Sequence, residues 1–359
     1  MKQYKMCKVC VMDTTDPDIK FYGNKGCSNC INAKRYYLTT KQKSKNLKEV
    51  IRKIRRDGIG KKYDCVIGMS GGVDSSYVAY VVKKLHLRPL AVHLDNGWDS
   101  ELAVQNIRNV LSKLDIDLYT YVIDWDEFRD IQMAFLKAST PDCEIPTDHA
   151  IVASLYEVAR KKHIKYIING YNVETETVHV PKWSHGHYDW KYIKSIHKKY
   201  GEKKIKTFPH YGRFMKFYYD RVAKIEKVSI LNYVPYNKAR VKAKLMKEFG
   251  WKDYGSKHEE SFYTKFYQNY ILPEKFGYDK RKMHLSSMIV SGQISREDAL
   301  KELEKSIYTD SEAARDCKYF CEKMQISEEE FEELMNAPKR TFWDYPNYEN
   351  DLIHKVFGI

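Results

Sequence analysis

Apolar runs of strand length alternate with amphipathic segments through the first two thirds of the chain. Runs rich in Val, Ile, Leu and Tyr predict buried strands at 63–69, 88–97, 118–124 and 165–172, with a further strand expected at 229–237. Apolar residues at helical spacing predict helices over 74–87, 100–114, 125–138 and 147–163. This alternation is typical of a doubly wound α/β fold with a parallel sheet, whose ligands lie beyond the carboxyl ends of the strands.

The segments before and after this α/β region are predicted to be mainly helical, apart from the cysteine-rich N-terminus. A basic helix is expected over 44–57, and helical patterns dominate after residue 237, two of them following the capping residues Ser295 and Ser327. We therefore divide the chain into a four-cysteine zinc-ribbon module at 1–43, a basic helical linker at 44–62, an α/β domain at 63–237 and a mostly helical substrate or partner domain at 238–359. Within the α/β domain, the basic and aromatic residues 173–227 are interpreted as an inserted lid.

Four of the eight cysteines have the spacing of metal ligands. Cys7, Cys10, Cys27 and Cys30 form a CxxC-x16-CxxC pattern, which is typical of a zinc ribbon or knuckle. Four thiolates fill a tetrahedral site completely, so this Zn²⁺ is expected to be structural rather than catalytic. Disulfides are the alternative. The sequence shows neither a secretion signal nor a membrane-spanning run, so we expect a cytoplasmic protein in a reducing compartment.

The formal net charge of +14 is concentrated in two regions. Residues 1–62 hold 17 Lys and Arg against 5 Asp and Glu, and residues 181–227 hold 13 against 4. Such regions favour contact with an anionic partner, which is a nucleic acid, a phosphorylated small molecule or an acidic protein. For residues 41–56, a solvated lysine face is the plainer alternative.

The stretch CVIGMSGGVDSS at 65–76 places a glycine-rich turn between a predicted strand and a predicted helix. Glycines let backbone N–H groups face an anion, and hydroxyls at a helix N-terminus add further donors. The residues of this turn are Ser70, Gly71, Gly72, Ser75 and Ser76. Asp74 can hold Mg²⁺ or cap the helix. Neither the Gly-Lys-Ser/Thr of a Walker loop nor the GxGxxG dinucleotide fingerprint is present.

The sequence SGGVDSS resembles the PP-loop of the ATP pyrophosphatases. The resemblance implies that ATP, with Mg²⁺, is cleaved between its α and β phosphates. The loop then binds pyrophosphate while a substrate oxygen takes the adenylyl group. Asp95 and Asn96, after the second strand, are expected near the adenosine or Mg²⁺.

The segment INGYNVETET at 168–177 resembles the second acidic motif of the same family. The resemblance gives Gly170 and Asn172 nucleotide-site roles and makes Glu174 and Glu176 candidates for substrate or Mg²⁺ binding. Tyr171 stands where many relatives have histidine, so its role stays open. His149, near the start of a predicted helix, is a candidate proton handler, with a structural histidine as the alternative.

The C-terminal half carries a more specific resemblance. GWKDYGSKHEES (250–261), KFGYDKR (275–281) and HLSSMIVSGQISREDAL (284–300) are similar to N-acetyl sugar amidotransferases of O-antigen, pseudaminic acid and legionaminic acid pathways. The likeness includes the cysteine module and VHLDNGWDSELA, and weakens over 181–227. It implies that an N-acetyl oxygen is adenylated and that ammonia displaces AMP to leave an acetamidino group. Motif residues expected in catalysis or substrate binding are Asp74, Lys257, His258, Lys280, Arg281, Glu260 and Lys275. Helix-surface roles are the alternative for Lys280, His258 and Glu260.

The same resemblance implies that ammonia comes from a separate glutaminase with a cyclase-like subunit of the histidine-biosynthesis type. None of the eight cysteines lies in a G-x-C-x-G setting. One of the two basic regions is expected to dock this partner, and neither a membrane nor a nucleic acid is expected as one. A tRNA-modifying adenylase and a non-catalytic scaffold are the alternatives.

Overall fold

The computed structural model describes residues 3–255 and 260–351, and its centre is a five-stranded parallel sheet. The strands are β1 (Cys65–Gly68), β2 (Pro89–Asp95), β3 (Asp117–Val122), β4 (Tyr166–Asn169) and β5 (Glu226–Ser229). They lie in the order β3-β2-β1-β4-β5, and every neighbouring pair is parallel. The predicted doubly wound α/β fold is therefore confirmed.

The fifth strand lies earlier in the chain than the sequence indicated. β5 pairs with β4 from Glu226 to Ser229, and Ile230–Tyr233 then form a 3₁₀ turn. The apolar residues Ile230 and Leu231, which suggested a strand at 229–237, are buried in this turn instead. Asn232 fixes the turn, because its Oδ1 accepts a 2.9 Å hydrogen bond from the Val173 amide. The prediction of a strand over 229–237 is wrong beyond Ser229.

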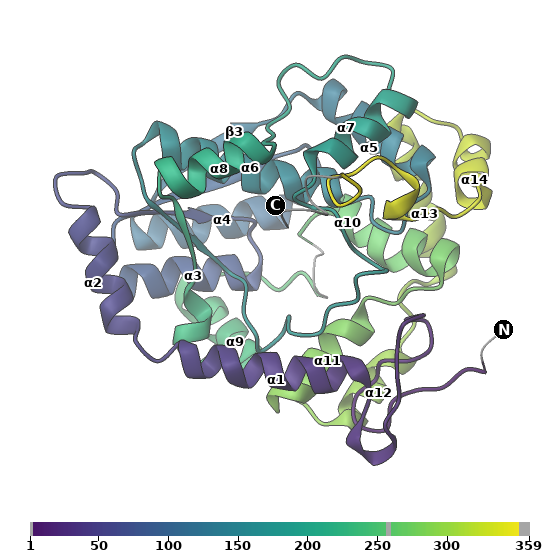
Figure 1. Ribbon diagram of the computed structural model, residues 1–359, viewed down its shortest axis with the longest axis horizontal. Coiled ribbons are helices and arrows are strands. Elements are labelled where there is room, and N and C mark those ends of the chain that lie inside the picture. Colours follow the sequence, from purple (N-terminus) through teal and green to yellow (C-terminus); the bar gives the residue numbers. More distant parts are fainter. Residues whose placement is uncertain (1–2, 256–259, 352–359) are drawn as a thin grey trace.

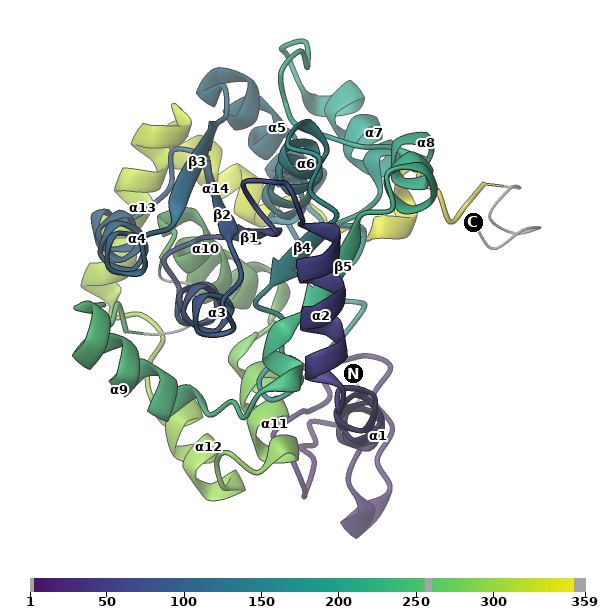
Figure 2. The same ribbon diagram turned by 90° about the vertical axis from the view of Figure 1, so that its left-hand side faces the viewer.

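Helices cover both faces of the sheet (Figure 2). One face carries α2 (Leu47–Asp57), α3 (Val73–Lys84), α4 (Glu101–Leu114) and α9 (Lys238–Phe249), and the other carries α6 (Ile145–Lys161). The strand alternation decides which side chain faces which layer. In β1, Cys65 and Ile67 pack with α3, whereas Val66 packs with α6.

The order of the strands reverses on either side of β1. The chain runs from β1 outward to β2 and β3, and then returns through α5 (Trp125–Ala138) and α6 to place β4 on the opposite side of β1. Loops leaving β1 and β4 therefore diverge and leave a crevice at their carboxyl ends. This topological switch point is where a doubly wound sheet binds ligands.

The cysteine module packs against the C-terminal helices rather than standing apart. Its helix α1 (Ser28–Lys43), which the sequence analysis did not predict, lies beside α11 (Arg281–Ser291) in both ribbon views (Figure 1). Lys34 Nζ donates to the Val290 carbonyl at 3.1 Å, and the buried Asp13 pairs with Lys282. Arg296 donates to the carbonyls of Cys7 and Cys10.

Four of the remaining helices form one apolar cluster with α5 on the right-hand side of Figure 1. They are α7 (Trp190–Tyr200), α10 (Phe262–Phe266), α13 (Asp310–Met324) and α14 (Glu328–Asn336). Helix α8 (Arg213–Phe217) lies at the other side, above α3, and α12 (Arg296–Glu304) packs on α11. A π-helical stretch at Tyr267–Phe276 extends α10. The predicted caps are confirmed, because Ser295 and Ser327 each close a capping box. No described helix has both the length and the apolar content that a bilayer crossing needs.

Much of the 173–227 insertion is core rather than a loose lid. Helix α7 packs on α5, with Tyr192, Ile193 and Ile196 fully buried. His197 Nε2 lies 2.8 Å from Asp130 of α5. The exposed part of the insertion is α8, where Phe214 is 92% exposed.

We expect Ile196→Ala to lower the free energy of unfolding by about 2–5 kcal/mol, because it empties a filled site in the core. Phe214→Ala, the matched control on the same insertion, is expected to change it by less than about 0.5 kcal/mol. Urea unfolding followed by tryptophan fluorescence measures both. A cost below about 1 kcal/mol for Ile196→Ala would show that α7 is a detachable lid.

Candidate active site

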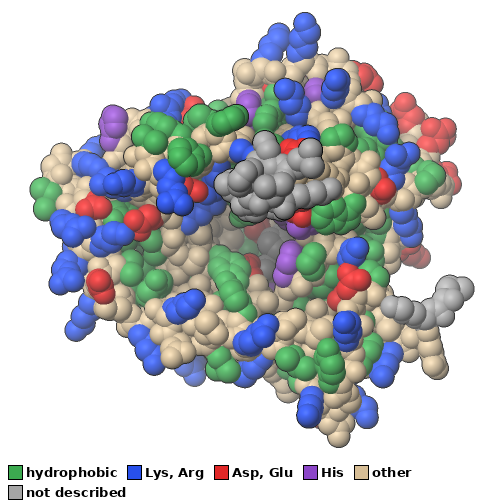
Figure 3. All heavy atoms as spheres, viewed as in Figure 1, with side chains coloured by type: hydrophobic (Ala, Val, Ile, Leu, Met, Phe, Trp, Pro, Cys, Tyr) green, Lys and Arg blue, Asp and Glu red, His purple; other side chains and the backbone are tan. Residues whose placement is uncertain are grey.

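A cavity of about 1850 Å³ opens at the switch point of the sheet. Figure 3 shows a hollow in the middle of this face, with a histidine side chain on its wall. The ends of β1 and β4, the start of α6, residues 175–189 and α11 line it. A single ligand site usually measures roughly 300–1,000 Å³. The cavity is therefore large enough for a nucleotide and a second substrate together.

The glycine-rich turn between β1 and α3 is held in a conformation that requires glycine. Gly71 has a φ of +80°, and a Cβ there would lie 2.5 Å from the carbonyl oxygen of Ala103. Trp251 Nε1 donates to the Gly71 carbonyl at 2.9 Å. The turn is thus clamped between α4 and the segment that follows α9.

The donors of this turn make long hydrogen bonds to nearby hydroxyls. Gly72 N–H reaches Ser70 Oγ at 3.3 Å, Ser70 N–H reaches Ser75 Oγ at 3.3 Å, and Val73 N–H reaches Tyr254 Oη at 3.3 Å. Backbone bonds of this kind are usually near 2.9–3.0 Å. Stronger acceptors, such as phosphate oxygens, can replace these hydroxyls. Ser70 and Ser75 line the cavity.

The other predicted loop residues differ in what they contact. Asp74 lies on the first turn of α3, where its carboxylate accepts the Tyr236 hydroxyl. Gly170 passes so close that a Cβ on it would lie 3.2 Å from Asp74 Cβ, so the end of β4 abuts α3. Ser76 is fully buried, and its Oγ has no hydrogen-bond partner in the described ranges 3–255 and 260–351.

Several residues predicted to bind nucleotide, substrate or Mg²⁺ have local structural partners. Asp95 accepts the Gly97 amide at 3.0 Å, and Asn172 accepts the Thr175 amide at 3.0 Å. Glu174 forms an ion pair with Lys41 of α1 at 2.6 Å. These three residues do not line the cavity. The predicted residues that do line it are Ser70, Ser75, Asn96, Gly170, Glu176, Glu260, Lys280 and Arg281.

His149 has the environment of a structural histidine. It is fully buried and stacks on Tyr211 with ring centres 4.8 Å apart. Its Nδ1 donates to the His187 carbonyl at 2.8 Å, and its Nε2 accepts the Tyr211 amide. Burial lowers the pKa of His149 to about 4, so the ring is neutral near pH 7. The geometry supports the structural alternative over the role of proton handler.

Lys275 lies away from the cavity. Its Nζ donates to the carbonyl of Leu334 in the last turn of α14, where a cation stabilises the end of a helix. The expectation that it contacts substrate is therefore not supported by its position. Lys257 and His258 fall outside the described residues. Glu260 is placed near the glycine-rich turn, because a Cβ on Gly72 would lie 3.2 Å from Glu260 Oε1.

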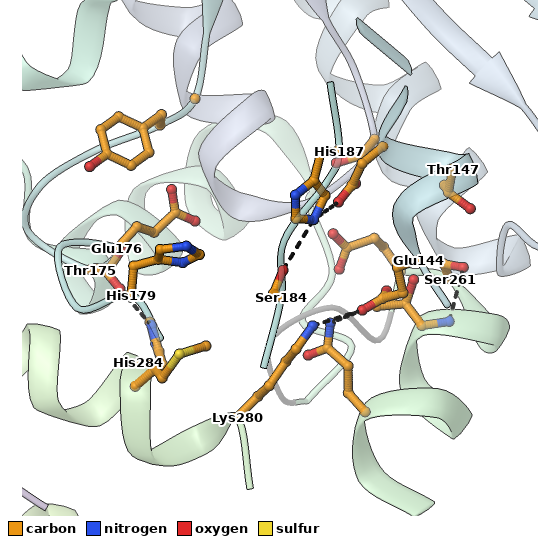
Figure 4. A pocket seen from close by; sticks show the side chains of 18 of the residues that line it. Glu144, Thr147, Thr175, Glu176, His179, Ser184, His187, Ser261, Lys280 and His284 are labelled. Carbon is orange, nitrogen blue, oxygen red and sulfur yellow. Dashed lines mark hydrogen bonds and ion pairs between the residues drawn. The ribbon is translucent and has the colours of Figure 1, made fainter. Parts of the chain in front are cut away.

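One wall of the cavity carries a group of charged residues that sequence reasoning mostly missed (Figure 4). Lys280 Nζ lies 3.2 Å from Glu144, and His187 Nε2 lies 3.3 Å from both Asp142 and Asp148. Only Lys280 was predicted. The histidine-rich stretch 185–187 was the sequence signal for the rest, but its carboxylate partners lie some 40 residues earlier in the chain.

The pKa values on this wall are mutually dependent. Burial alone would lower the pKa of His187, but Asp142 and Asp148 raise it to about 9, so the ring is protonated near neutral pH. Asp148 opens into the cavity, but the protein walls around it shield it from bulk solvent and raise its pKa to about 6, against the opposing effect of His187. Lys280 and His187 hold the pKa of Asp142 well below its usual range despite its burial.

Figure 4 also shows the facing wall, where Glu176, His179 and His284 lie. His284 Nδ1 lies 3.0 Å from the Thr175 carbonyl, and Lys238 Nζ lies 3.2 Å from its Nε2. Both ring nitrogens of His284 therefore have polar contacts at this wall. The cavity thus has hydrogen-bonding side chains on both sides.

The four predicted zinc ligands meet in one buried cluster. Their Sγ atoms all lie within 4.8 Å of one another, with Cys7–Cys30 at 3.9 Å, Cys10–Cys27 at 3.6 Å and Cys27–Cys30 at 3.8 Å. A tetrahedron with Zn–S bonds of about 2.3 Å requires sulfurs about 3.8 Å apart. All eight cysteines are free thiols. The donor set therefore fits Zn²⁺ and not a pair of disulfides.

Two family models match different parts of the chain. A model described as "NAD synthase" matches residues 41–208, and one described as "LPS biosynthesis protein WbpG-like, C-terminal domain" matches residues 260–357. The chain is therefore similar to an NAD synthase over 41–208 and to a WbpG-like C-terminal domain over 260–357. This supports the predicted PP-loop superfamily and a relationship to lipopolysaccharide biosynthesis.

Curated relatives are similar over parts of the chain. "Uncharacterized protein MJ1599" of Methanocaldococcus jannaschii is 28% identical over 46% of this chain and 59% of its own. "tRNA-specific 2-thiouridylase MnmA" of Clostridioides difficile is 31% identical over 31% of this chain and 35% of its own. The chain thus spans less than two thirds of either relative.

Solved structures are similar at a lower level. An NMN synthetase from Francisella tularensis gives a TM-score of 0.29 at 15% identity, over 62% of this chain and 92% of that one. An NH3-dependent NAD synthetase from Campylobacter jejuni gives 0.29 at 16% identity, over 62% and 99%.

We expect the purified chain to carry one Zn²⁺, because four buried thiols at tetrahedral spacing have no other partner of comparable strength. Native mass spectrometry should show one bound zinc in the wild type and its loss in Cys27→Ser. Cys317→Ser, a partly exposed cysteine of α13 outside the cluster, serves as the matched control and should keep the metal. A zinc-free wild type, or equal loss in both variants, would contradict the assignment.

Proposed function

We propose that this protein is an ATP-dependent amidotransferase. It adenylates the N-acetyl group of a nucleotide-linked or nonulosonic bacterial surface sugar and uses ammonia to convert the amide into an acetamidino group. The proposal places it in O-antigen or flagellin glycan biosynthesis. The match of residues 260–357 to a WbpG-like domain supports the sugar-pathway assignment. The PP-loop and the NAD synthase match support adenylation.

The main support for this proposal is that residues of the α/β domain and residues of the C-terminal region line the same cavity. Ser70 and Ser75 of the glycine-rich turn and Lys280 of the WbpG-like region open into the same space. Adenylation requires that the α-phosphorus and the acceptor oxygen meet. A shared cavity of about 1850 Å³ allows this without movement of one domain relative to the other.

The chemistry follows from the poor reactivity of amides, because the nitrogen lone pair is donated into the carbonyl. The amide oxygen attacks the α-phosphorus, the α–β phosphate bond breaks, and pyrophosphate leaves toward the turn at Gly71 and Gly72. The backbone donors and hydroxyls there stabilise its charge. Asp74 is the residue of the turn that would hold Mg²⁺. Ammonia then adds to the imidate carbon, and AMP leaves.

We further propose that ammonia is supplied by a separate glutaminase with a cyclase-like subunit. The chain itself has no cysteine in the G-x-C-x-G setting of a glutaminase nucleophile. The exposed, basic part of the insertion around α8, with Phe214 and Phe217 on its surface, supports a docking role for that segment.

A tRNA-modifying adenylase is the second candidate, and its support is the partial similarity to a 2-thiouridylase. That similarity covers 31% of the chain, whereas the WbpG-like match accounts for the C-terminal helices. The two candidates differ in binding. A tRNA enzyme should bind tRNA with a steep salt dependence, because several phosphate contacts release counterions.

The test is incubation with ATP, Mg²⁺, ammonium and a panel of UDP- and CMP-linked diacetamido sugars. We expect sugar-dependent release of AMP and pyrophosphate, and a product whose mass shows an amide changed to an amidine. Ser75→Ala should lower AMP formation by about 10²-fold, because it removes a donor from the pyrophosphate site. The control Ser112→Ala, exposed on α4, should match wild type. Amidine formation unaffected by Ser75→Ala would contradict the assigned role of the turn.

A further inference from the structure

Asp148 differs in its surroundings from the neighbouring carboxylates of the cavity wall. It lies in the first turn of α6, and its side chain is 51% exposed, into the cavity that it lines. Glu144, one turn earlier, is 9% exposed, and its Oε2 already accepts Gln268 at 2.6 Å and Lys280 at 3.2 Å. Asp279 is bound by the guanidinium of Arg281. Asp148 is paired with His187 at 3.3 Å, and the part of its carboxylate that opens into the cavity can accept a proton from a bound molecule.

His187 holds Asp148 in place from one side. Its Nε2 lies 3.3 Å from Asp148 and 3.3 Å from the buried Asp142, and 3.1 Å from Ser184 Oγ. The backbone of His187 is fixed as well, because its carbonyl accepts from His149. His187 is thus a positioned cation that orients the Asp148 carboxylate while leaving part of it open to the cavity.

The proposed reaction requires a proton acceptor at one defined step. When ammonia adds to the O-adenylylated amide, the new nitrogen carries three hydrogens and a positive charge. The carbon–oxygen bond to AMP breaks cleanly only after one of these protons is removed. AMP then leaves with the electron pair of that bond, and the product is an amidinium cation. One proton is released in each turnover.

We propose that Asp148, oriented by His187, accepts this proton from the attacking ammonia. The N–H bond of the adduct breaks as the Asp148 O–H bond forms, and the carboxyl group later returns the proton to solvent through the cavity. No oxidant, reductant or further reactant is needed. This inference rests on the proposed function, because it assigns a residue to the second half of that reaction.

The surroundings of Asp148 give the step a defined pH dependence. The charged or titratable groups that face it are His187 and Tyr188 from the insertion, Asp142 and Glu144 before and at the start of α6, and Lys280 from the start of α11. Desolvation inside the cavity, together with the negative charges of Glu144 and Asp142, raises the pKa of Asp148, whereas His187 and Lys280 lower it, and the net result is a pKa of about 6. A base must be ionised to act, so the ammonia step should slow as the pH falls through about 6 and be fully active above it.

The test separates the two half-reactions in the full chain. Sugar-dependent exchange of labelled pyrophosphate into ATP reports adenylation, and mass spectrometry of the sugar reports amidine formation. We expect Asp148→Asn to lower amidine formation by about 10²–10⁴-fold and to leave exchange within about threefold of wild type. At a fixed concentration of free ammonia, the variant should lose the decline below pH 6 that wild type shows. Asp115→Asn, on the exposed turn after α4, is the matched control and should leave both rates unchanged.

A rescue experiment distinguishes a proton acceptor from a structural side chain. Added formate should raise the rate of amidine formation by Asp148→Ala at least tenfold, because formate can occupy the vacated space and accept the proton. Amidine formation by Asp148→Asn at the wild-type rate, equal loss of exchange and amidine formation, or absence of formate rescue would each overturn the proposal. A wild type that makes no amidine from any sugar of the panel would instead refute the proposed function, and this inference with it.

Discussion

The cavity depends on one tight contact, the packing of Gly71 against the carbonyl of Ala103. A side chain at Gly71 would need both a left-handed backbone and space that α4 occupies. Trp251 then fixes the same peptide from the other side through the Gly71 carbonyl. Because three separate parts of the chain meet there, the amides that follow are held in place before any ligand arrives. Donors fixed by packing need little reorganisation to bind an anion.

The far wall is organised by charge rather than by apolar packing. Three carboxylates and two cations lie along it: Asp142, Glu144, Asp148, His187 and Lys280. Buried charges persist when each has a partner, since an unpaired one would carry a large desolvation penalty. The module that bears the four cysteines supports this wall indirectly. Its helix α1 packs along α11, whose first turn follows Lys280 directly.

The sequence predicted those features whose physical cause is local. The strand–turn–helix around Gly71 and the two CxxC pairs are read from adjacent residues, and both are present in the structure. Helix α1 was missed, because its apolar face is narrow and only Cys30 and Ala33 are buried. The prediction of a strand at 229–237 was wrong because a turn that buries apolar residues has the same local composition as a buried strand.

The candidate site was harder to predict than the fold. His149 and His187 are both histidines, but only tertiary contacts show that the first is buried in an aromatic stack and the second faces Asp148. Lys275 and Lys280 belong to one short motif. The side chain of Lys275, however, donates to a carbonyl at the end of α14, whereas Lys280 lines the cavity. Roles of this kind depend on partners distant in the sequence, which no local pattern specifies.

The central claim is that the turn at Gly71 and Gly72 binds the phosphates that leave ATP. The most direct test is a crystal structure of the chain with Mg²⁺ and α,β-methylene-ATP, which cannot be cleaved at the relevant bond. The account predicts β and γ phosphate oxygens about 2.7–3.2 Å from the amides of Gly72 and Val73, in place of the Ser70 and Tyr254 hydroxyls. Phosphates bound elsewhere in the cavity, with those hydroxyls undisturbed, would contradict it.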